Sequence, residues 1–235
     1  FKKNELMPVF WLHPDRIEFP NPNFANADGI VAIGGDLSPK RLLLAYRIGL
    51  FPWFNENEPI LWWSLDPRLV LFPNDLYIAK SMRPYFNQQK FKVTFDNHFE
   101  RVVRACQKST RKGQGGDSWI SEKIVQAYSQ LHELGYAHSV EVWQGEDLVG
   151  GLYGISIGKV FFGESMFTEV SNASKVGFIT LVQKLTELGY WLIDCQQQTQ
   201  HLTSMGATPI KRTQFLKILK KNEAEPDNPA SWKNW

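Results

Sequence analysis

Two short apolar runs of this sequence carry polar side chains that could do chemistry. The first, residues 190–196, ends in Asp194 and Gln196, and the second, residues 160–166, contains Glu164. A buried strand that ends in polar residues delivers them to the edge of a sheet, where sheet-based enzymes keep their sites. Because an unpaired carboxylate is costly to bury, its presence in an apolar run favours a functional interpretation.

Asp194 and Glu164 each have a functional and a purely structural interpretation. Side chains alternate along a strand, so Asp194 and Gln196 are expected on one face, where the carboxylate can orient the amide and the amide can orient an amine. A neutral amide is no base, so Gln196 cannot itself remove a proton. The alternative for Asp194 is a cap on the following turn. Glu164 either binds an ammonium group or is an edge-strand carboxylate that faces water.

Aromatic and basic residues add two further candidate surfaces. Trp53, Trp62, Trp63 and Trp119 could stack a base, although a single tryptophan more often fills a core. Two basic stripes could follow a phosphate backbone, although each alone is typical of a solvated helix face. The first stripe comprises Arg101, Arg104, Lys108, Arg111 and Lys112, and the second comprises Lys211, Arg212, Lys217, Lys220 and Lys221.

Composition excludes several classes of protein. The chain has 235 residues, of which 43% are hydrophobic, so we expect one or two domains with a substantial core. The net charge of +2 excludes a polycation. Cys106 and Cys195 form no disulfide framework and fit a reducing cytosol. No apolar run approaches the roughly 20 residues that cross a bilayer, and no signal peptide is recognisable; we expect a cytoplasmic protein with no membrane partner.

Three motif matches fail on their context. Ser156 lies in a G-x-S-x-G string, and Asp194 and His201 follow in hydrolase order, but the string falls within a predicted strand rather than at a strand-to-helix turn. His132 and Glu133 match the start of the zinc motif H-E-x-x-H, but Tyr136 occupies the position of its second histidine. No metal is therefore expected. The glycine-rich residues 113–116 match no phosphate-binding loop.

The elements that must position these residues follow from periodicity and helix caps. Residues 30–33 are a predicted strand, and Ser38 and Pro39 begin a helix that stops at Gly49. A boundary near Asp66 divides the chain into domains 1–66 and 67–235. The remaining predicted elements are strands at 69–72, 91–95, 139–143, 148–157, 160–166 and 190–194, and helices at 97–108, 121–135, 172–188, 199–205 and 213–221. Residues 1–29 are expected to be irregular, 109–117 a polar loop, and 222–235 a loose tail.

The order of these elements predicts an α+β fold. An antiparallel meander of three strands, a helix, a strand and another helix is the order of the GNAT acyltransferase core. That core binds acetyl-CoA with a glycine-rich loop that opens the helix after the meander. Residues 170–177 do not match this loop. The order therefore predicts acyl transfer from a donor other than CoA, although fold alone does not give function.

The sequence resembles one family closely, the bacterial leucyl/phenylalanyl-tRNA–protein transferases. The resemblance extends from about Asp15 to Thr213, and its strings taken together are highly specific. They are GIVAIGGDLSP at 29–39, GLFPWF at 49–54, LWWS at 61–64, WI at 119–120, HSVEVW at 138–143, FGESMF at 162–167, NASK at 172–175 and LIDCQ at 192–196.

This resemblance implies a fold and an activity. The fold would be a small N-terminal α/β domain followed by a GNAT-like mixed-sheet domain. The activity would be transfer of Leu or Phe, and less well Met, from aminoacyl-tRNA to proteins with N-terminal Arg or Lys, which marks them for N-degron-dependent degradation. The partners would be leucyl-tRNA, phenylalanyl-tRNA and the acceptor proteins. No cofactor is implied, and a monomer is expected.

The resemblance also implies roles for individual residues. Asp194 and Gln196 would be catalytic, Trp53 and Trp119 would hold the terminal adenosine of the tRNA, and Glu164 would bind the acceptor or the donor amino group. The substrate pocket would be lined by Leu152, Phe161, Ser165, Met166, Leu181, Leu185 and Ile193. Arg101, Arg104, Lys108, Arg111 and Lys112 would contact tRNA phosphates. In an apolar pocket, the binding free energies of two ligands that differ by one methylene differ by only about 1–3 kcal/mol, so overlapping donor specificity is expected.

Four alternatives stay open at this point. A CoA-dependent N-acetyltransferase is disfavoured by the missing pyrophosphate loop. An RNA-binding module would need the basic stripes and tryptophans but not Asp194, Gln196 and Glu164. A Ser156 hydrolase would lose its activity in Ser156→Ala. An aminoacyl-tRNA-dependent cell-wall peptide transferase would share the chemistry and differ in its acceptor.

Overall fold

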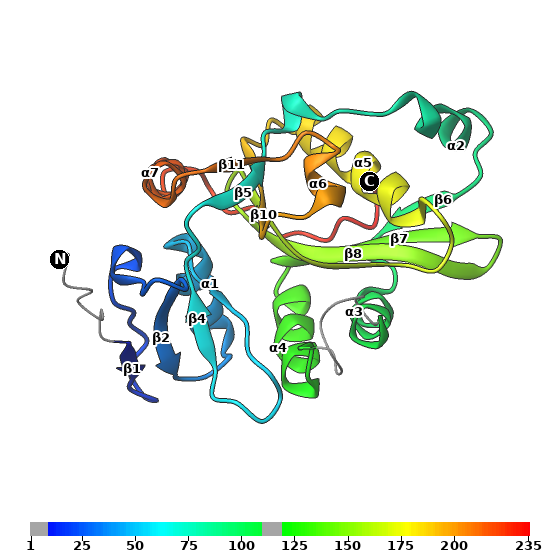
Figure 1. Ribbon diagram of the computed structural model, residues 1–235. Coiled ribbons are helices and arrows are strands. Elements are labelled where there is room, and N and C mark those ends of the chain that lie inside the picture. The colour runs from blue at the N-terminus through cyan, green and yellow to red at the C-terminus, as the bar shows by residue number, and fades with distance from the viewer. Residues whose placement is uncertain (1–8, 110–118) are drawn as a thin grey trace.

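The chain forms two β-sheets, and helices cover both faces of the larger one (Figure 1). The computed structural model describes residues 9–109 and 119–235. The first sheet has the strand order β1-β2-β4-β3. Its strands are β1 (Phe10–Leu12), β2 (Ile30–Gly34), β3 (Phe51–Pro52) and β4 (Leu61–Trp63). The second sheet begins at Arg68; the division into domains at residue 66 stays a prediction.

Helix α1 (Pro39–Arg47) covers the first sheet and begins where the sequence predicts. Ser38 is its N-cap, and the Ser38 hydroxyl accepts the N–H of Arg41 at 3.4 Å. Gly49 follows the helix with a φ of +86°, which a residue with a side chain rarely adopts. The expectation that residues 1–29 are irregular is wrong in part, because β1 pairs in parallel with β2 and a 3₁₀ turn occupies Pro22–Phe24. A strand of three residues is too short to give a periodic signal.

The second sheet has the order β11-β5-β10-β9-β8-β7-β6. Strands β7, β8 and β9 form the predicted antiparallel meander, and β9 pairs in parallel with β10. The strands are β5 (Arg68–Leu71), β6 (Lys92–Phe95), β7 (Ala137–Gln144), β8 (Asp147–Ile157), β9 (Val160–Thr168), β10 (Leu192–Gln196) and β11 (Thr208–Ile210). The mixed sheet confirms the α+β fold class, and the edge strand β11 was not predicted.

Helices pack on both faces of this sheet. Helices α3 (Phe99–Lys108) and α4 (Glu122–Glu133) lie on one face, and α5 (Ala173–Glu187) lies on the other (Figure 1). The other helical segments of the second part of the chain are η2 (Pro73–Asp75), η3 (Lys80–Met82), α2 (Arg83–Asn87), α6 (Gln200–Thr203) and α7 (Arg212–Asn222). The order meander, α5, β10, α6 is the one that the sequence predicts for a GNAT-like domain. Within the described residues, no helix is long and apolar enough to cross a membrane.

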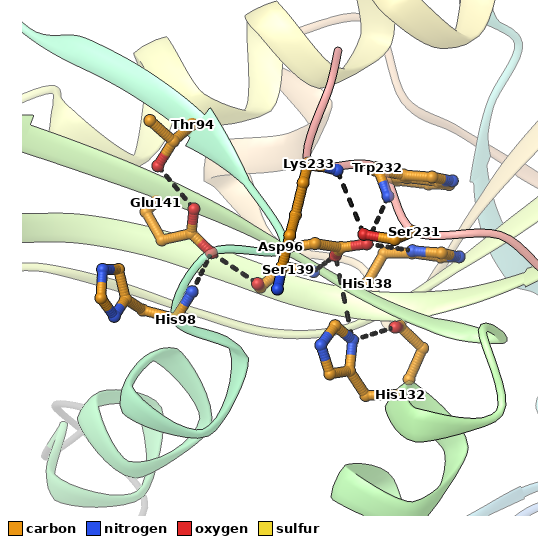
Figure 2. Close-up of polar contacts among 11 residues, drawn as sticks. Thr94, Asp96, His98, His132, His138, Ser139, Glu141, Ser231, Trp232 and Lys233 are labelled. Carbon is orange, nitrogen blue, oxygen red and sulfur yellow. Dashed lines mark hydrogen bonds and ion pairs between the residues drawn. The ribbon is translucent and has the colours of Figure 1, made fainter.

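The C-terminal tail contradicts its expected looseness. Trp232 is only 3% exposed and packs into the apolar cluster that also contains Phe161 and Leu181. Its backbone N–H donates to the Asp96 carboxylate at 2.7 Å (Figure 2). The polar composition of residues 222–235 concealed this anchor, because one buried tryptophan hardly changes the average hydropathy of such a segment.

Candidate active site

A cavity of about 600 Å³ is bounded by β8, β9 and β10, the start of α5, and the end of β3. Ligand pockets in proteins commonly measure about 300–1,000 Å³. Most of the predicted site residues line this single cavity. They are Trp53, Trp119, Leu152, Phe161, Glu164, Ser165, Met166, Ile193, Asp194 and Gln196. Residues far apart in the sequence therefore meet in one space.

Two predicted pocket residues lie elsewhere. Leu181 and Leu185 are fully buried in the apolar cluster that contains Leu152 and Phe161, but they do not line the cavity. The cavity meets only the first turns of α5, where Lys175 and Phe178 line it. Leu181 and Leu185 lie one and two turns further along the axis, since each turn advances the helix by about 5.4 Å. They support the wall from behind.

Glu164 is a buried carboxylate at a β-bulge. Tyr153 pairs with Ser165 and Gly154 pairs with Gly163, so Glu164 is the extra residue of β9. Bulges occur often beside active sites, where they redirect a side chain. Glu164 is 8% exposed in an interior strand of the sheet, which rules out the edge-strand alternative.

Two tyrosine hydroxyls, one from α1 and one from α4, donate hydrogen bonds to the Glu164 carboxylate. Tyr46 of α1 donates its hydroxyl to Oε1 at 2.8 Å, and Tyr128 of α4 donates its hydroxyl to Oε2 at 2.8 Å. Burial raises the pKa of Glu164 to about 7, although the two tyrosine hydroxyls act in the opposite direction. The same carboxylate therefore exchanges its proton near neutral pH, as a group suited to acid–base work would.

Gln196 is oriented by Glu164. Its side-chain amide nitrogen donates to Oε1 of Glu164 at 3.0 Å. The expectation that Asp194 orients the Gln196 side chain is wrong, because Asp194 accepts the backbone N–H of Gln196, at 3.0 Å, while the side chain donates to Glu164. A second bulge causes the difference: the pairing with β5 shifts between Asp194 and Gln196, and Gln196 has a φ of +58°. The regular alternation of the strand ends before Gln196.

Asp194 forms a buried ion pair with Arg68. Arg68 Nε and Nη2 donate to the two carboxylate oxygens at 2.8 and 2.6 Å, and the side chains are 1% and 0% exposed. The guanidinium carbon lies 4.5 Å from the ring centre of Phe51 and 4.9 Å from that of Phe215. This bidentate pair joins β5 to β10, and its aromatic contacts join the second sheet to β3 and α7. Asp194 is thus a fixed support at the end of β10.

The tryptophans divide into two groups. Trp53 and Trp119 are half-buried and line the cavity, whereas Trp62 is fully buried in the core of the first sheet. Trp63 is half-buried and donates its indole N–H to the carbonyl of Trp53 at 2.6 Å. The core interpretation therefore holds for Trp62, and the stacking interpretation stays available for Trp53 and Trp119.

The basic stripes lie outside the cavity lining. Arg101 and Lys108 are exposed on α3, whereas Arg104 is ion-paired with Glu100 and Glu122. Arg111, Lys112 and most of the expected polar loop 109–117 lie outside the described residues. In the second stripe, Arg212 forms an ion pair with Asp66 and donates to the carbonyl of Ser64 at 3.0 Å. Lys220 likewise forms an ion pair with Glu223, so several residues of the two stripes are engaged with the protein itself.

Two residues that belong to motif matches in the sequence, Ser156 and His132, lie outside the cavity lining. The hydroxyls of Ser156 and Tyr190 lie 2.6 Å apart, and Ser156 does not line the cavity. His132 contacts the carbonyl of Ala137 at 2.7 Å. Among residues 9–109 and 119–235, no group of three or more His, Cys, Asp or Glu side chains is placed to hold a metal ion.

Sequence reasoning missed three functional partners. Arg68, Tyr46 and Tyr128 hold the two carboxylates of the site, yet Tyr46 and Tyr128 occupy the apolar faces of amphipathic helices and look like core residues in the sequence. Arg68 is the exception, because it directly precedes an apolar run in the sequence. A charge beside a buried strand requires a partner of opposite charge, and this could have pointed to an ion pair.

The strands and helices follow the order that the sequence predicts for a GNAT-like domain, and the cavity combines aromatic, apolar and carboxylate surfaces. Two family descriptions match the chain: "Leucyl/phenylalanyl-tRNA protein transferase" at residues 70–220 and "Leucyl/phenylalanyl-tRNA protein transferase N-terminal domain" at residues 35–66. A transferase of this name from Christiangramia forsetii is 56% identical over 90% of this chain and 100% of its own length. One from Syntrophobacter fumaroxidans is 53% identical over 96% of each chain. The chain belongs to the leucyl/phenylalanyl-tRNA–protein transferase family and is an aminoacyltransferase.

Similar solved structures are more distant. L-PGS from Bacillus licheniformis is 11% identical, with a TM-score of 0.40 over 70% of this chain and 55% of that chain. A GCN5-related N-acetyltransferase from Kribbella flavida is 12% identical, with a TM-score of 0.34 over 73% of this chain and 60% of that chain. Likeness at this level says nothing about activity.

Proposed function

We propose that this chain transfers Leu or Phe, and less well Met, from aminoacyl-tRNA to the α-amino group of proteins with N-terminal Arg or Lys. The product carries a destabilising N-terminal residue and enters the N-degron pathway. The enzyme acts as a cytoplasmic monomer, with aminoacyl-tRNA as substrate and no cofactor. This proposal follows from the family membership of the chain and from the chemistry of its cavity.

One observation carries the proposal: a single cavity combines three surfaces that this reaction needs. Trp53 and Trp119 offer aromatic faces for the terminal adenine. Leu152, Phe161 and Ile193 offer an apolar wall for the donor side chain. The third surface is polar and consists of the Glu164–Gln196 pair. Outside the cavity, exposed Arg101 and Lys108 are the proposed tRNA phosphate contacts.

The bond changes of the reaction are simple. The neutral α-amine of the acceptor attacks the carbonyl carbon of the aminoacyl ester, a C–N bond forms, and the bond from that carbon to the ribose oxygen breaks. The nitrogen loses one proton, and the ribose oxygen leaves as a hydroxyl group that has gained one. Because the ester is already activated, holding both reactants together supplies much of the catalysis, at most about 7–11 kcal/mol.

Gln196 positions the attacking amine. Its amide nitrogen is committed to Glu164 at 3.0 Å, which leaves its side-chain carbonyl oxygen to accept an N–H of the amine. Glu164 fixes the orientation of this amide. Because burial raises its pKa to about 7, Glu164 is negatively charged above neutral pH and can there attract an ammonium group of the donor or the acceptor.

Asp194 acts through the backbone. The Arg68 pair fixes its carboxylate, and Oδ1 accepts the N–H of Gln196 at 3.0 Å. This bond holds Gln196 in its left-handed backbone conformation, which an L-residue adopts at some cost. Asp194 is therefore a positioning residue in this mechanism, and Gln196 contacts the substrate.

The test is label transfer from phenylalanyl-tRNA to three peptides that begin with Arg, Ala or acetylated Arg, with acetyl-CoA as a competing donor. We expect transfer to the free Arg peptide alone. Transfer to no peptide with tRNA still bound would favour an RNA-binding module. Acetylation of the peptides would favour a CoA-dependent enzyme, and equal transfer to the Ala peptide would refute the acceptor specificity.

A further inference from the structure

The C-terminal tail runs from α7 to the apolar cluster that contains the cavity-lining residue Phe161. After α7 the chain passes the turn between α4 and β7 so closely that a Cβ atom on Gly135 would lie 2.9 Å from the carbonyl carbon of Pro229. The tail then inserts Trp232, which is 3% exposed, into the interior. Trp235 stacks on Trp232 with ring centres 3.9 Å apart.

A hydrogen bond to Asp96 and stacking on His138 hold Trp232 in this position (Figure 2). Asp96, which precedes α3, accepts the backbone N–H of Trp232 at 2.7 Å and that of Ser139 at 3.0 Å. The same carboxylate contacts Nδ1 of His138 at 2.9 Å. The His138 ring lies flat against the Trp232 indole, with ring centres 3.6 Å apart and an interplanar angle of 1°. The indole is therefore fixed both by its backbone and by its face.

A third ring beside the Trp232 indole, after those of His138 and Trp235, belongs to the cavity wall. The ring of Phe161 lies 5.8 Å from it, inclined by 33°. Phe161 lines the cavity, and the apolar cluster of Trp232 includes four other buried lining residues, which are Leu152, Phe178, Ile193 and Leu202. Trp232 itself does not line the cavity, so any influence on a ligand passes through the lining residues, of which Phe161 is its ring contact.

We infer that Trp232 is a positioning residue for donor specificity: it supports Phe161 from behind and so sets the depth of the apolar wall that receives the donor side chain. This inference rests on the proposed function. Protein interiors are close-packed, so Phe161 has no space to withdraw while the indole is in place. Removal of the indole would leave a void that Phe161 can enter, and the cavity would deepen for a larger donor side chain.

The test compares Trp232→Ala and Trp232→Leu with wild type. Both substitutions keep the backbone N–H that donates to Asp96, so this hydrogen bond of the tail is retained. The measured quantity is kcat/KM with tryptophanyl-tRNA divided by kcat/KM with leucyl-tRNA, for transfer to an Arg peptide. We expect Trp232→Ala to raise this ratio about tenfold or more, the scale of pocket discrimination for small changes in apolar size. Trp232→Leu should give an intermediate rise, and Trp232→Phe should stay near wild type.

Trp235→Ala is the matched control. It removes the other stacked indole of the tail, whose ring pairs are with Trp232 and Phe95 rather than with Phe161. It should lower the melting temperature and leave the ratio unchanged. Trp232→Leu decides the matter if Trp232→Ala does not fold.

An unchanged ratio in folded Trp232 variants, or an equal rise in Trp235→Ala, would overturn the inference. The failure of the proposed function is distinguishable, because wild type would then transfer neither amino acid to the Arg peptide.

Discussion

Replacement of Asp194 by alanine should destabilise the protein far more than replacement of Gln196, although both should abolish transfer. The Asp194–Arg68 pair is bidentate, its contacts are 2.8 and 2.6 Å long, and both side chains are shielded from water. Loss of one partner from a buried pair costs about 3–5 kcal/mol, because the other charge stays buried. For a chain of this size that corresponds to a fall in melting temperature of about 6–20 °C.

The contrast with Gln196 follows from exposure. Gln196 is half-buried, and its truncation removes a hydrogen bond worth about 1 kcal/mol. Urea unfolding followed by circular dichroism measures both changes. The double variant Arg68→Met/Asp194→Leu serves as the control, because apolar replacement of a complete buried pair is often neutral or stabilising. It should recover most of the stability but none of the transfer.

Asp194→Ala that unfolds at the same urea concentration as wild type would refute this reasoning, since the ion pair would then contribute nothing to the fold. A fully active double variant would refute it in a second way. In that case neither the carboxylate nor its hold on the Gln196 backbone would be needed for transfer.

Further predictions concern binding, pH and the excluded hydrolase. Trp53→Ala and Trp119→Ala should each weaken donor binding by about 1–3 kcal/mol, the scale of base stacking; unaltered affinity for aminoacyl-adenosine would exclude that role. Burial raises the pKa of Glu164 from its ordinary 4.5 to about 7. Between these two pH values the folded state retains a proton that the unfolded state has lost. Stability from this group should therefore fall as pH rises from about 4.5 to about 7, and Glu164→Gln should remove that slope in urea unfolding measured across this range. An identical slope in the variant would place the titration elsewhere. Ser156→Ala should leave label transfer unchanged, and a loss of activity would restore the hydrolase alternative.

Much of the framework is predictable because it is local. The meander, α4 and α5 are long and periodic, and their glycine and serine boundaries follow from backbone conformation. Glu164 and Gln196 could be singled out because each interrupts an apolar strand. The family strings add Trp53 and Trp119, which the structure brings to the same cavity.

The connections within the site are not predictable because they are long-range. Tyr46 is 118 residues from Glu164 in sequence, and Trp232 is 136 residues from Asp96. The bulge at Glu164 depends on how β8 and β9 pair, and no local signal marks it. Its consequence is large, since bulges rather than strand alternation decide that Gln196 meets Glu164 and not Asp194.

The most direct test of the central claim is single-turnover transfer from phenylalanyl-tRNA to an Arg peptide by wild type and Gln196→Ala. Donor binding is measured in the same samples. If Gln196, oriented by Glu164, positions the attacking amine, Gln196→Ala should bind the donor as wild type does but lose transfer. A Gln196→Ala enzyme that binds the donor and transfers Phe at the wild-type rate would contradict the account.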